Sequence, residues 1–428
     1  MDDNIKIFKG NIIFTPTKDA FKCHNNAYIV VENGKVSGIY DNLEDKLSKE
    51  QIIDCSQMLI VPGFVDLHFH APQFANRGLG LDKELLPWLE TYTFPEEKKY
   101  EDIHYAEKIY RRLVHEIWKV GTTRIVFFSS IHSESTELLF DLFDKAKIGA
   151  YIGKVNMDRN APDYILEDTE KSLKETENFI LKYKDKSDLV KPIVTPRFVP
   201  SCTPELLEGL GELALKYNIP VQSHLSENTH EVAWVKELHP ESLNYADVYS
   251  KYKLFGQTKT VMAHCVYTTD EEIELMAKNH VYAAHCPHSN YNLSSGIMPV
   301  RKFLNANVSV GLATDVSGCH ETSIAKVMVS AIQASKIKWL ETNREDIALN
   351  TSEVFYLGTK GGGSFFGKVG SFEPGYDFDA LIIDDSNLGN IENLTLEERL
   401  QRFIYIGDDR NIVDRYVKGT KIKEPEVF

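Results

Sequence analysis

Four histidines and one aspartate stand where apolar, strand-like runs end. His68-Phe69-His70 ends one run, and residues at i and i+2 of a strand face the same side. His224, His264 and Asp315 end three more runs. Neutral imidazole commonly binds zinc or iron, whereas a buried Asp without a partner is costly. A lone His-x-His is often a chance surface or core pair, but four such ends together predict one metal site.

Eight strand-like runs alternate with helix-like segments along the middle of the chain. The strand-like runs span 63–70, 122–128, 150–156, 191–198, 219–226, 260–265, 281–286 and 309–314. Helix-like segments include 105–119, 166–183, 204–217, 270–278 and 300–305. This alternation predicts parallel strands with right-handed crossovers, and eight units predict an α/β fold of the (β/α)8 TIM-barrel type. The histidines and Asp315 would then lie at the carboxyl ends of the strands, where such barrels place their active sites.

Both ends of the chain are β-rich. Strand-like runs lie at 5–14, 27–31, 36–40, 367–369 and 380–384, and two helical segments precede the last two runs, at 325–336 and 352–357. Asn33-Gly34 predicts a hairpin turn, since both residues tolerate positive φ. We expect the tail to pair with the N-terminal strands, so that residues 1–66 and 367–428 form a small β-sandwich domain. Residues 67–366 would form the catalytic barrel, with an extra helix and a lid after its first strand.

Composition restricts the partners and the location of the protein. Lys and Arg number 48 and Asp and Glu number 63 among 428 residues, a formal charge of −15, which disfavours binding to nucleic acid. The six cysteines include no Cys-x-x-Cys pair and are typical of reduced thiols in a cytoplasmic protein. The start of the chain does not resemble a secretory signal. No run reaches the roughly 18 apolar residues of a membrane span, so no membrane partner is expected.

Several motifs resemble the amidohydrolase superfamily and, within it, the guanine deaminase family. The superfamily is indicated by Pro62-Gly63-Phe64-Val65-Asp66-Leu67-His68-Phe69-His70 together with the later histidines and Asp315. The narrower family is indicated by His70-Ala71-Pro72-Gln73, Tyr92-Thr93-Phe94-Pro95, Gly121-Thr122-Thr123, Thr195-Pro196-Arg197-Phe198, Ser223-His224-Leu225-Ser226-Glu227-Asn228 and His285-Cys286-Pro287 running to Asn290. The resemblance covers residues 61–315, and the flanking β segments weakly.

The resemblance implies one divalent metal ion per chain. Its ligands would be His68, His70, His224 and Asp315, and His264 would hold the water molecule at the metal. The run at 191–198 has no Lys at its tip, where binuclear relatives carry a carbamylated Lys, so a single ion is expected. Zinc is the expected metal and iron the alternative. The resemblance also implies a homodimer.

The implied reaction is the hydrolytic deamination of guanine to xanthine and ammonia, a step of purine catabolism. Asp315 is the expected base that takes a proton from water. Glu227 is the expected acid, which protonates the ring nitrogen beside C2 and then the departing amino group. The alternative reading of Glu227 is a solvated loop residue.

Arg197 and Gln73 are the residues expected to recognise the substrate. Arg offers a planar fork of donors to a carbonyl oxygen, which guanine has and adenine lacks, while Gln offers both a donor and an acceptor to a ring edge. His224 and Asp315 would also contact the substrate. Phe198 and, less strongly, Trp88 are candidates for stacking, although such aromatics are often plain core. The alternative reading of Arg197 is a surface ion pair.

The sequence is also compatible with other functions. A superfamily member could instead deaminate cytosine, adenosine or a triazine, or open a cyclic amide. A catalytically silent scaffold on the same barrel is a further alternative, but such a protein should have lost ligands. The other deaminase fold is excluded, because it needs Pro-Cys-x-x-Cys zinc ligands. Cys265, His288, Cys319 and His320 have no assigned role.

Overall fold

Two four-stranded parallel sheets form the centre of the computed structural model, which describes residues 5–43, 47, 51–389 and 393–427. The first sheet has the order β5 (Phe64–His70), β6 (Thr122–Phe128), β7 (Gly149–Gly153) and β9 (Val190–Pro192). The second has the order β11 (Val221–Leu225), β12 (Thr260–His264), β13 (Tyr282–His285) and β14 (Val310–Leu312). A short parallel pair joins β8 (Val155–Asn156) to β10 (Thr195–Pro196). These strands are almost entirely buried, as expected for parallel strands covered on both faces.

The two parallel sheets are linked at both edges. After β9, Val194 forms a parallel bridge with Val221 of β11. At the other edge, the Asp315 amide donates to the His68 carbonyl at 2.9 Å, and the His70 amide donates to the Val316 carbonyl at 3.2 Å. One apolar cluster includes side chains from both sheets, among them Val65, Leu67, Val126, Ile193, Val261 and Ala263. The predicted α/β fold with parallel strands is confirmed.

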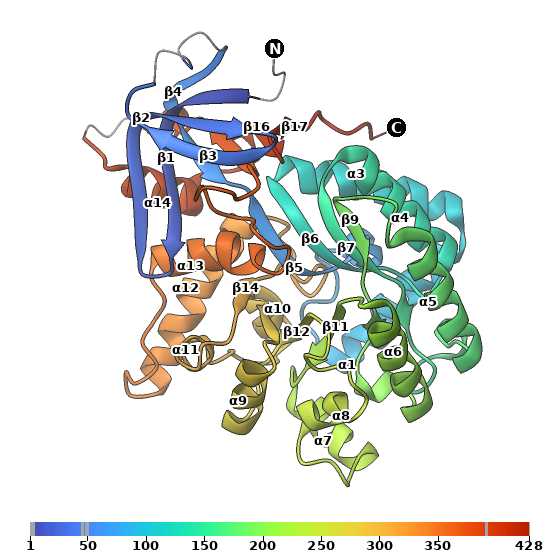
Figure 1. Cartoon of the computed structure of the whole chain (residues 1–428). Coiled ribbons are helices and arrows are strands. Elements are labelled where there is room, and N and C mark those ends of the chain that lie inside the picture. Colours follow the sequence, from blue (N-terminus) through green and yellow to red (C-terminus); the bar gives the residue numbers. More distant parts are fainter. Residues whose placement is uncertain (1–4, 44–46, 48–50, 390–392, 428) are drawn as a thin grey trace.

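Helices lie between successive strands, on the outside of the sheets (Figure 1). They include α3 (Ile103–Lys119), α4 (Ser133–Ala146), α5 (Thr169–Tyr183), α6 (Pro204–Tyr217), α9 (Asp270–Lys278), α11 (Val300–Asn305), α12 (Ile324–Glu341) and α13 (Thr351–Tyr356). Their starts follow from local chemistry: the Thr203 side chain accepts from the Leu206 amide, and Pro204 occupies the first turn of α6. The predicted helices are confirmed, whereas α4, α7 (Thr229–Leu238) and α8 (Tyr245–Lys251) were not predicted.

Strands from both ends of the chain form one seven-stranded sheet. Its order is β17 (Thr420–Lys421), β16 (Ile412–Val417), β15 (Ala380–Ile383), β4 (Ile52–Pro62), β1 (Ile5–Thr17), β2 (Ala20–Glu32) and β3 (Lys35–Tyr40). Antiparallel pairing of β15 with β4 brings the blue N-terminal and red C-terminal strands together (Figure 1). Asn33 and Gly34 turn the hairpin between β2 and β3 with φ of 52° and 76°. The predicted pairing of the two chain ends and the predicted hairpin are confirmed.

The C-terminal tail differs from its prediction in two respects. Residues 367–369 do not form a strand, because Gly367 and Gly370 have φ of 114° and 80° and turn the backbone out of the extended conformation. Val369 between them is apolar for another reason, since its side chain packs in the interior cluster. The tail also contains a helix, α14 (Leu396–Ile406), which packs against β1, β2 and α12. The strand predicted at 367–369 was therefore wrong, and α14 was not predicted.

A long segment after β5 adds short helices near the carboxyl ends of the strands. These are η1 (Ala71–Asn76), α1 (Leu85–Trp88), the π-helical η2 (Leu89–Thr93) and α2 (Phe94–Lys98). They confirm the extra helix predicted after the first parallel strand, and the predicted lid stays a prediction. Throughout the described ranges, every helix is too short or too polar to cross a membrane.

Candidate active site

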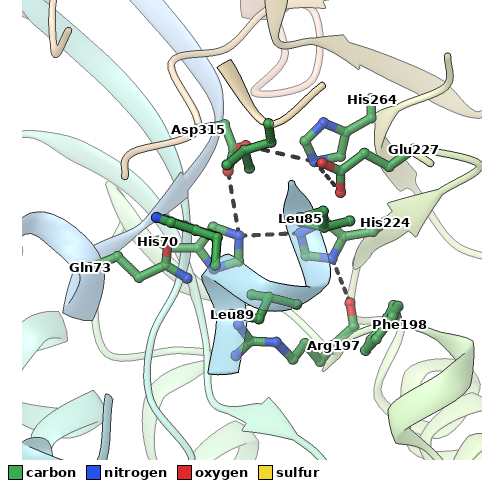
Figure 2. A pocket seen from close by; sticks show the side chains of 12 residues that line it. His70, Gln73, Leu85, Leu89, Arg197, Phe198, His224, Glu227, His264 and Asp315 are labelled. Atoms are coloured by element: carbon green, nitrogen blue, oxygen red, sulfur yellow. Dashed lines mark hydrogen bonds and ion pairs between the residues drawn. The ribbon is translucent and has the colours of Figure 1, made fainter. Parts of the chain in front are cut away.

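The strand-end histidines and Asp315 meet in one buried cluster. Figure 2 shows His70, His224, His264 and Asp315 of this cluster. The Nε2 atom of His68 lies 3.1 Å from Oδ1 of Asp315. The Nε2 atoms of His70 and His224 lie 3.1 Å apart, and Nε2 of His264 lies 3.7 Å from Oδ2 of Asp315. β5, β11, β12 and the residues after β14 thus bring together all five side chains that the sequence analysis singled out.

The far nitrogens of two imidazoles are held by hydrogen bonds that set their tautomers. Nδ1 of His224 donates to the Arg197 carbonyl oxygen at 2.5 Å, and Nδ1 of His264 donates to Oδ1 of Asn290 at 2.9 Å. In each ring Nε2 is then the atom directed to the cluster. Burial lowers the pKa of His68, His70 and His224 well below the usual range. These rings are therefore neutral, as metal ligands must be.

The donor set fits a single divalent cation. Two groups of three residues have ligand atoms within 4.8 Å of one another: His68, His224 and His264, and His68, His70 and Asp315. Nε2 of His68 is buried without a hydrogen-bond partner in the described structure. Imidazole nitrogens with one carboxylate suit zinc or iron rather than calcium or magnesium. Arg197, and no lysine, follows β10.

Glu227 lies beside this cluster as a buried acid. Its Oε2 is 3.4 Å from Nε2 of His264, and its Oε1 accepts a hydrogen bond from Ser295 at 3.2 Å. Burial, and then the negative charge of Asp315, raises the pKa of Glu227 to about 8. Burial also raises the pKa of Asp315, to about 6. The Glu227 carboxyl thus keeps its proton to a higher pH than the Asp315 carboxyl.

The backbone is strained at two residues of the cluster. His264 and Asp315 have φ of 72° and 53°, in the left-handed region that residues other than glycine rarely adopt. Each such residue costs roughly 1–3 kcal/mol, and it persists only where the surroundings hold it. The amides of Cys265 and Asp315 each make a 2.9 Å hydrogen bond to a neighbouring strand, which supplies that hold.

Asp66 ties the first and last parallel strands together beneath the cluster. Its carboxylate accepts from the Thr314 hydroxyl at 2.6 Å, the Thr314 amide at 3.1 Å and the His68 amide at 3.2 Å. The Asp66 carboxylate therefore links the two backbone segments that carry His68 and Asp315. The sequence analysis gave Asp66 no role, although an acidic residue with apolar neighbours on both sides, Val65 and Leu67, was the signal available.

A pocket opens beside the cluster. It is lined by His70, Gln73, Leu85, Trp88, Leu89, Arg197, Phe198, His224, Glu227, His264, Leu293 and Asp315. Gln73 from η1 and Arg197 after β10 are the polar groups of this lining away from the cluster (Figure 2). Both contact Glu97 of α2. The sequence analysis missed Glu97, because that residue follows no strand and belongs to none of the quoted motifs.

Four residues without an assigned role lie outside the described pocket lining. Cys265 and Cys319 are buried, and burial raises the pKa of both thiols. The rings of His288 and His320 lie 5.3 Å apart.

Residues 59–422 match the amidohydrolase family. This chain belongs to the amidohydrolase family. Among curated amidohydrolases, a guanine deaminase from Dictyostelium discoideum is 41% identical over 98% of both chains. The guanine deaminase from Homo sapiens is 40% identical over 92% of this chain and 91% of its own. A crystal structure of guanine deaminase from C. acetobutylicum, with bound guanine in the active site, is 57% identical, covers 98% of this chain and 100% of its own, and has a TM-score of 0.97.

Proposed function

We propose that this protein hydrolyses guanine to xanthine and ammonia, as a hydrolase acting on a C–N bond of a cyclic amidine. The observation that carries the proposal is the pairing of two features in one pocket. Arg197 and Gln73 lie on one side, and the histidines and Asp315 lie on the other. The near-full-length likeness to curated guanine deaminases selects guanine among the substrates that such a pocket could take.

In this proposal, His68, His70, His224 and Asp315 would hold one divalent cation. Zinc is the first choice and iron the second, because nitrogen donors dominate the set. When bound, such an ion lowers the pKa of a water molecule from 15.7 to about 7. His264 orients that water, since its Nε2 faces both Asp315 and Glu227.

The two carboxyl groups move the protons. Asp315 takes a proton from the water as oxygen bonds to C2 of the purine. Glu227, protonated at neutral pH, gives its proton to the ring nitrogen beside C2, then takes the proton of the new C2 hydroxyl and delivers it to the amino group. The proton that Asp315 took from water afterwards restores Glu227. The C2–N bond then breaks and ammonia leaves. The oxygen and both protons of water are thereby divided between xanthine and ammonia.

The remaining pocket residues recognise the base. Arg197 donates to the carbonyl oxygen of guanine, and Gln73 pairs with an edge of the ring. Phe198, with Trp88 and the leucines, forms the apolar wall against the ring faces. His224 and Asp315 contact the substrate at the reacting end.

The proposal also covers the architecture, location and partners of the protein. The eight parallel strands close into a (β/α)8 barrel, supported by the bridge at Val194 and the hydrogen bonds at His68 and His70. Residues 1–66 and 367–428 form the β-sandwich domain and residues 67–366 the catalytic domain, supported by the change of sheet between β4 and β5. The protein is a cytoplasmic homodimer that binds no nucleic acid. Six free cysteines and the charge of −15 support the location and the lack of nucleic acid.

The test is ammonia release by purified protein of known metal content, offered guanine, adenine, cytosine and adenosine. Ammonia and xanthine from guanine alone would establish the reaction. Activity on another base alone would overturn the substrate and leave the metal chemistry standing. Inactivity on all four with one metal bound would overturn guanine deamination in favour of a cyclic amide or triazine, and inactivity without metal would favour a scaffold.

A further inference from the structure

Glu97 is a buried carboxylate whose two oxygens bind two different pocket residues. Oε1 accepts from Nε2 of Gln73 at 2.9 Å, and Oε2 accepts from Nη1 of Arg197 at 2.6 Å. The side chain is 3% exposed and is not itself part of the pocket lining. Glu97 therefore acts on a bound ligand only through Gln73 and Arg197.

The Gln73 amide is held in one of its two possible orientations. On one side it meets the Glu97 carboxylate, which only accepts. On the other side its Oε1 meets the Ser317 amide, which only donates, at 3.2 Å. Reversing the amide would place a donor against a donor at Ser317 and an acceptor against an acceptor at Glu97. The pattern that Gln73 presents to the pocket is thus decided by its two neighbours.

The Arg197 guanidinium is held by the same helix. Nη1 is bound to Glu97, and Cζ lies 5.2 Å from the centre of the Phe94 ring. Phe94 and Glu97 are both in α2, so one short helix sets the direction of the guanidinium. Glu97 also pairs a buried positive charge that would otherwise stand alone near the site for a divalent cation.

We propose that Glu97 is a positioning residue for ligand specificity, which fixes Gln73 and Arg197 so that the pocket favours a purine carrying a carbonyl oxygen at C6. The proposal rests on the proposed function, because it takes those two residues as the readers of the base. It names α2 as the structural origin of the selectivity.

A substitution of Glu97→Gln separates this role from simple packing. Arg197 only donates, so the single oxygen of the new amide must face Arg197, and its NH2 group must face Gln73. Gln73 can keep its orientation, with its NH2 group against that NH2 group, or rotate and turn its NH2 group against the Ser317 amide. Either arrangement leaves two donors facing each other, and the rotated one inverts the pattern offered to the ligand.

Glu96 offers a matched control one residue away. It is in the same helix, it is also buried, and it binds Lys99 Nζ at 2.6 Å and the Tyr105 hydroxyl. Neither partner lines the pocket. Glu96→Gln therefore makes the same chemical change with no route to Gln73 or Arg197.

The experiment measures binding of hypoxanthine, which has the C6 oxygen, and of purine, which lacks it, by calorimetry on metal-loaded protein. We expect Glu97→Gln to weaken hypoxanthine binding on the order of 10- to 100-fold, and purine binding by no more than about threefold. Glu96→Gln should leave both affinities within about threefold of wild type. Equal losses for both ligands in Glu97→Gln, or an unchanged preference for hypoxanthine, would overturn the proposal.

Glu97→Asp covers the case in which Glu97→Gln does not fold. It keeps both acceptors but withdraws them by one methylene, so the preference for hypoxanthine should fall less than in Glu97→Gln and remain below wild type. A wild-type preference in a Glu97→Asp variant with native thermal unfolding would overturn the proposal. The ammonia assay on wild-type protein tests the proposed function separately, since the binding preference requires no turnover.

Discussion

On one side of the pocket the histidines come from strands β5, β11 and β12, whereas on the other side the polar groups come from segments between strands. A strand-borne ligand is directed by the backbone, because alternate side chains of a strand face one way. Gln73 and Arg197 have no such guide and are directed by side-chain hydrogen bonds to Glu97. Changes on the first side should therefore affect metal and turnover, and changes on the second side should affect ligand preference.

The largest effect is expected where a strand-end carboxylate is lost. Asp315→Asn removes both a charged ligand and the proposed base, so activity should fall by at least about 10³-fold together with metal content. Elemental analysis alongside the ammonia assay checks this. Chelation of the wild-type metal should abolish activity, and adding zinc back should restore it. Full metal content with normal turnover in Asp315→Asn would remove that residue from the site.

A smaller loss is expected from the acid beside the cluster. Glu227→Gln keeps the shape of the side chain but cannot transfer a proton, so kcat should fall by about 10²-fold or more. Metal content should remain at the wild-type level, because Glu227 is not among the proposed ligands. Normal turnover in this variant, or loss of its metal, would contradict the prediction.

A substitution of Asn290 tests whether the tautomer of His264 depends on the hydrogen bond to the Asn290 side chain. Asn290→Leu removes the acceptor of the 2.9 Å bond from His264 Nδ1, so kcat/KM should fall roughly 10- to 100-fold. The same variant should keep its affinity for hypoxanthine, since Asn290 does not line the pocket. A loss of affinity with unchanged kcat would show that the two sides of the pocket are not separable.

The smallest effect is expected on the side of the pocket that carries Gln73 and Arg197. Arg197→Lys keeps the positive charge but loses the planar fork, so KM for guanine should rise about tenfold while kcat stays within about threefold. Steady-state kinetics with guanine, at confirmed metal content, separate the two parameters. A fall in kcat with unchanged KM would place Arg197 in the chemical step instead.

Local pattern was sufficient for much of the fold and for the strand-borne half of the site. Apolar runs alternating with amphipathic segments predicted the parallel strands, and the period of two predicted that His68 and His70 share a face. Asn33-Gly34 predicted its hairpin, because two adjacent residues suffice to make that turn. Each of these inferences depends on residues close together in the chain.

Only the tertiary structure decided how Gln73 and Arg197 are held. Glu97 is 24 residues from Gln73 and 100 residues from Arg197, and no local pattern encodes either pairing. Asp66 likewise meets Thr314 across 248 residues. The tail shows the same limit: Gly367-Lys368-Val369 was predicted as a strand, but the backbone turns there and Val369 packs in the interior. Sequence sets which residues are apolar or polar, whereas the partner of a buried polar group depends on which segments the fold brings together.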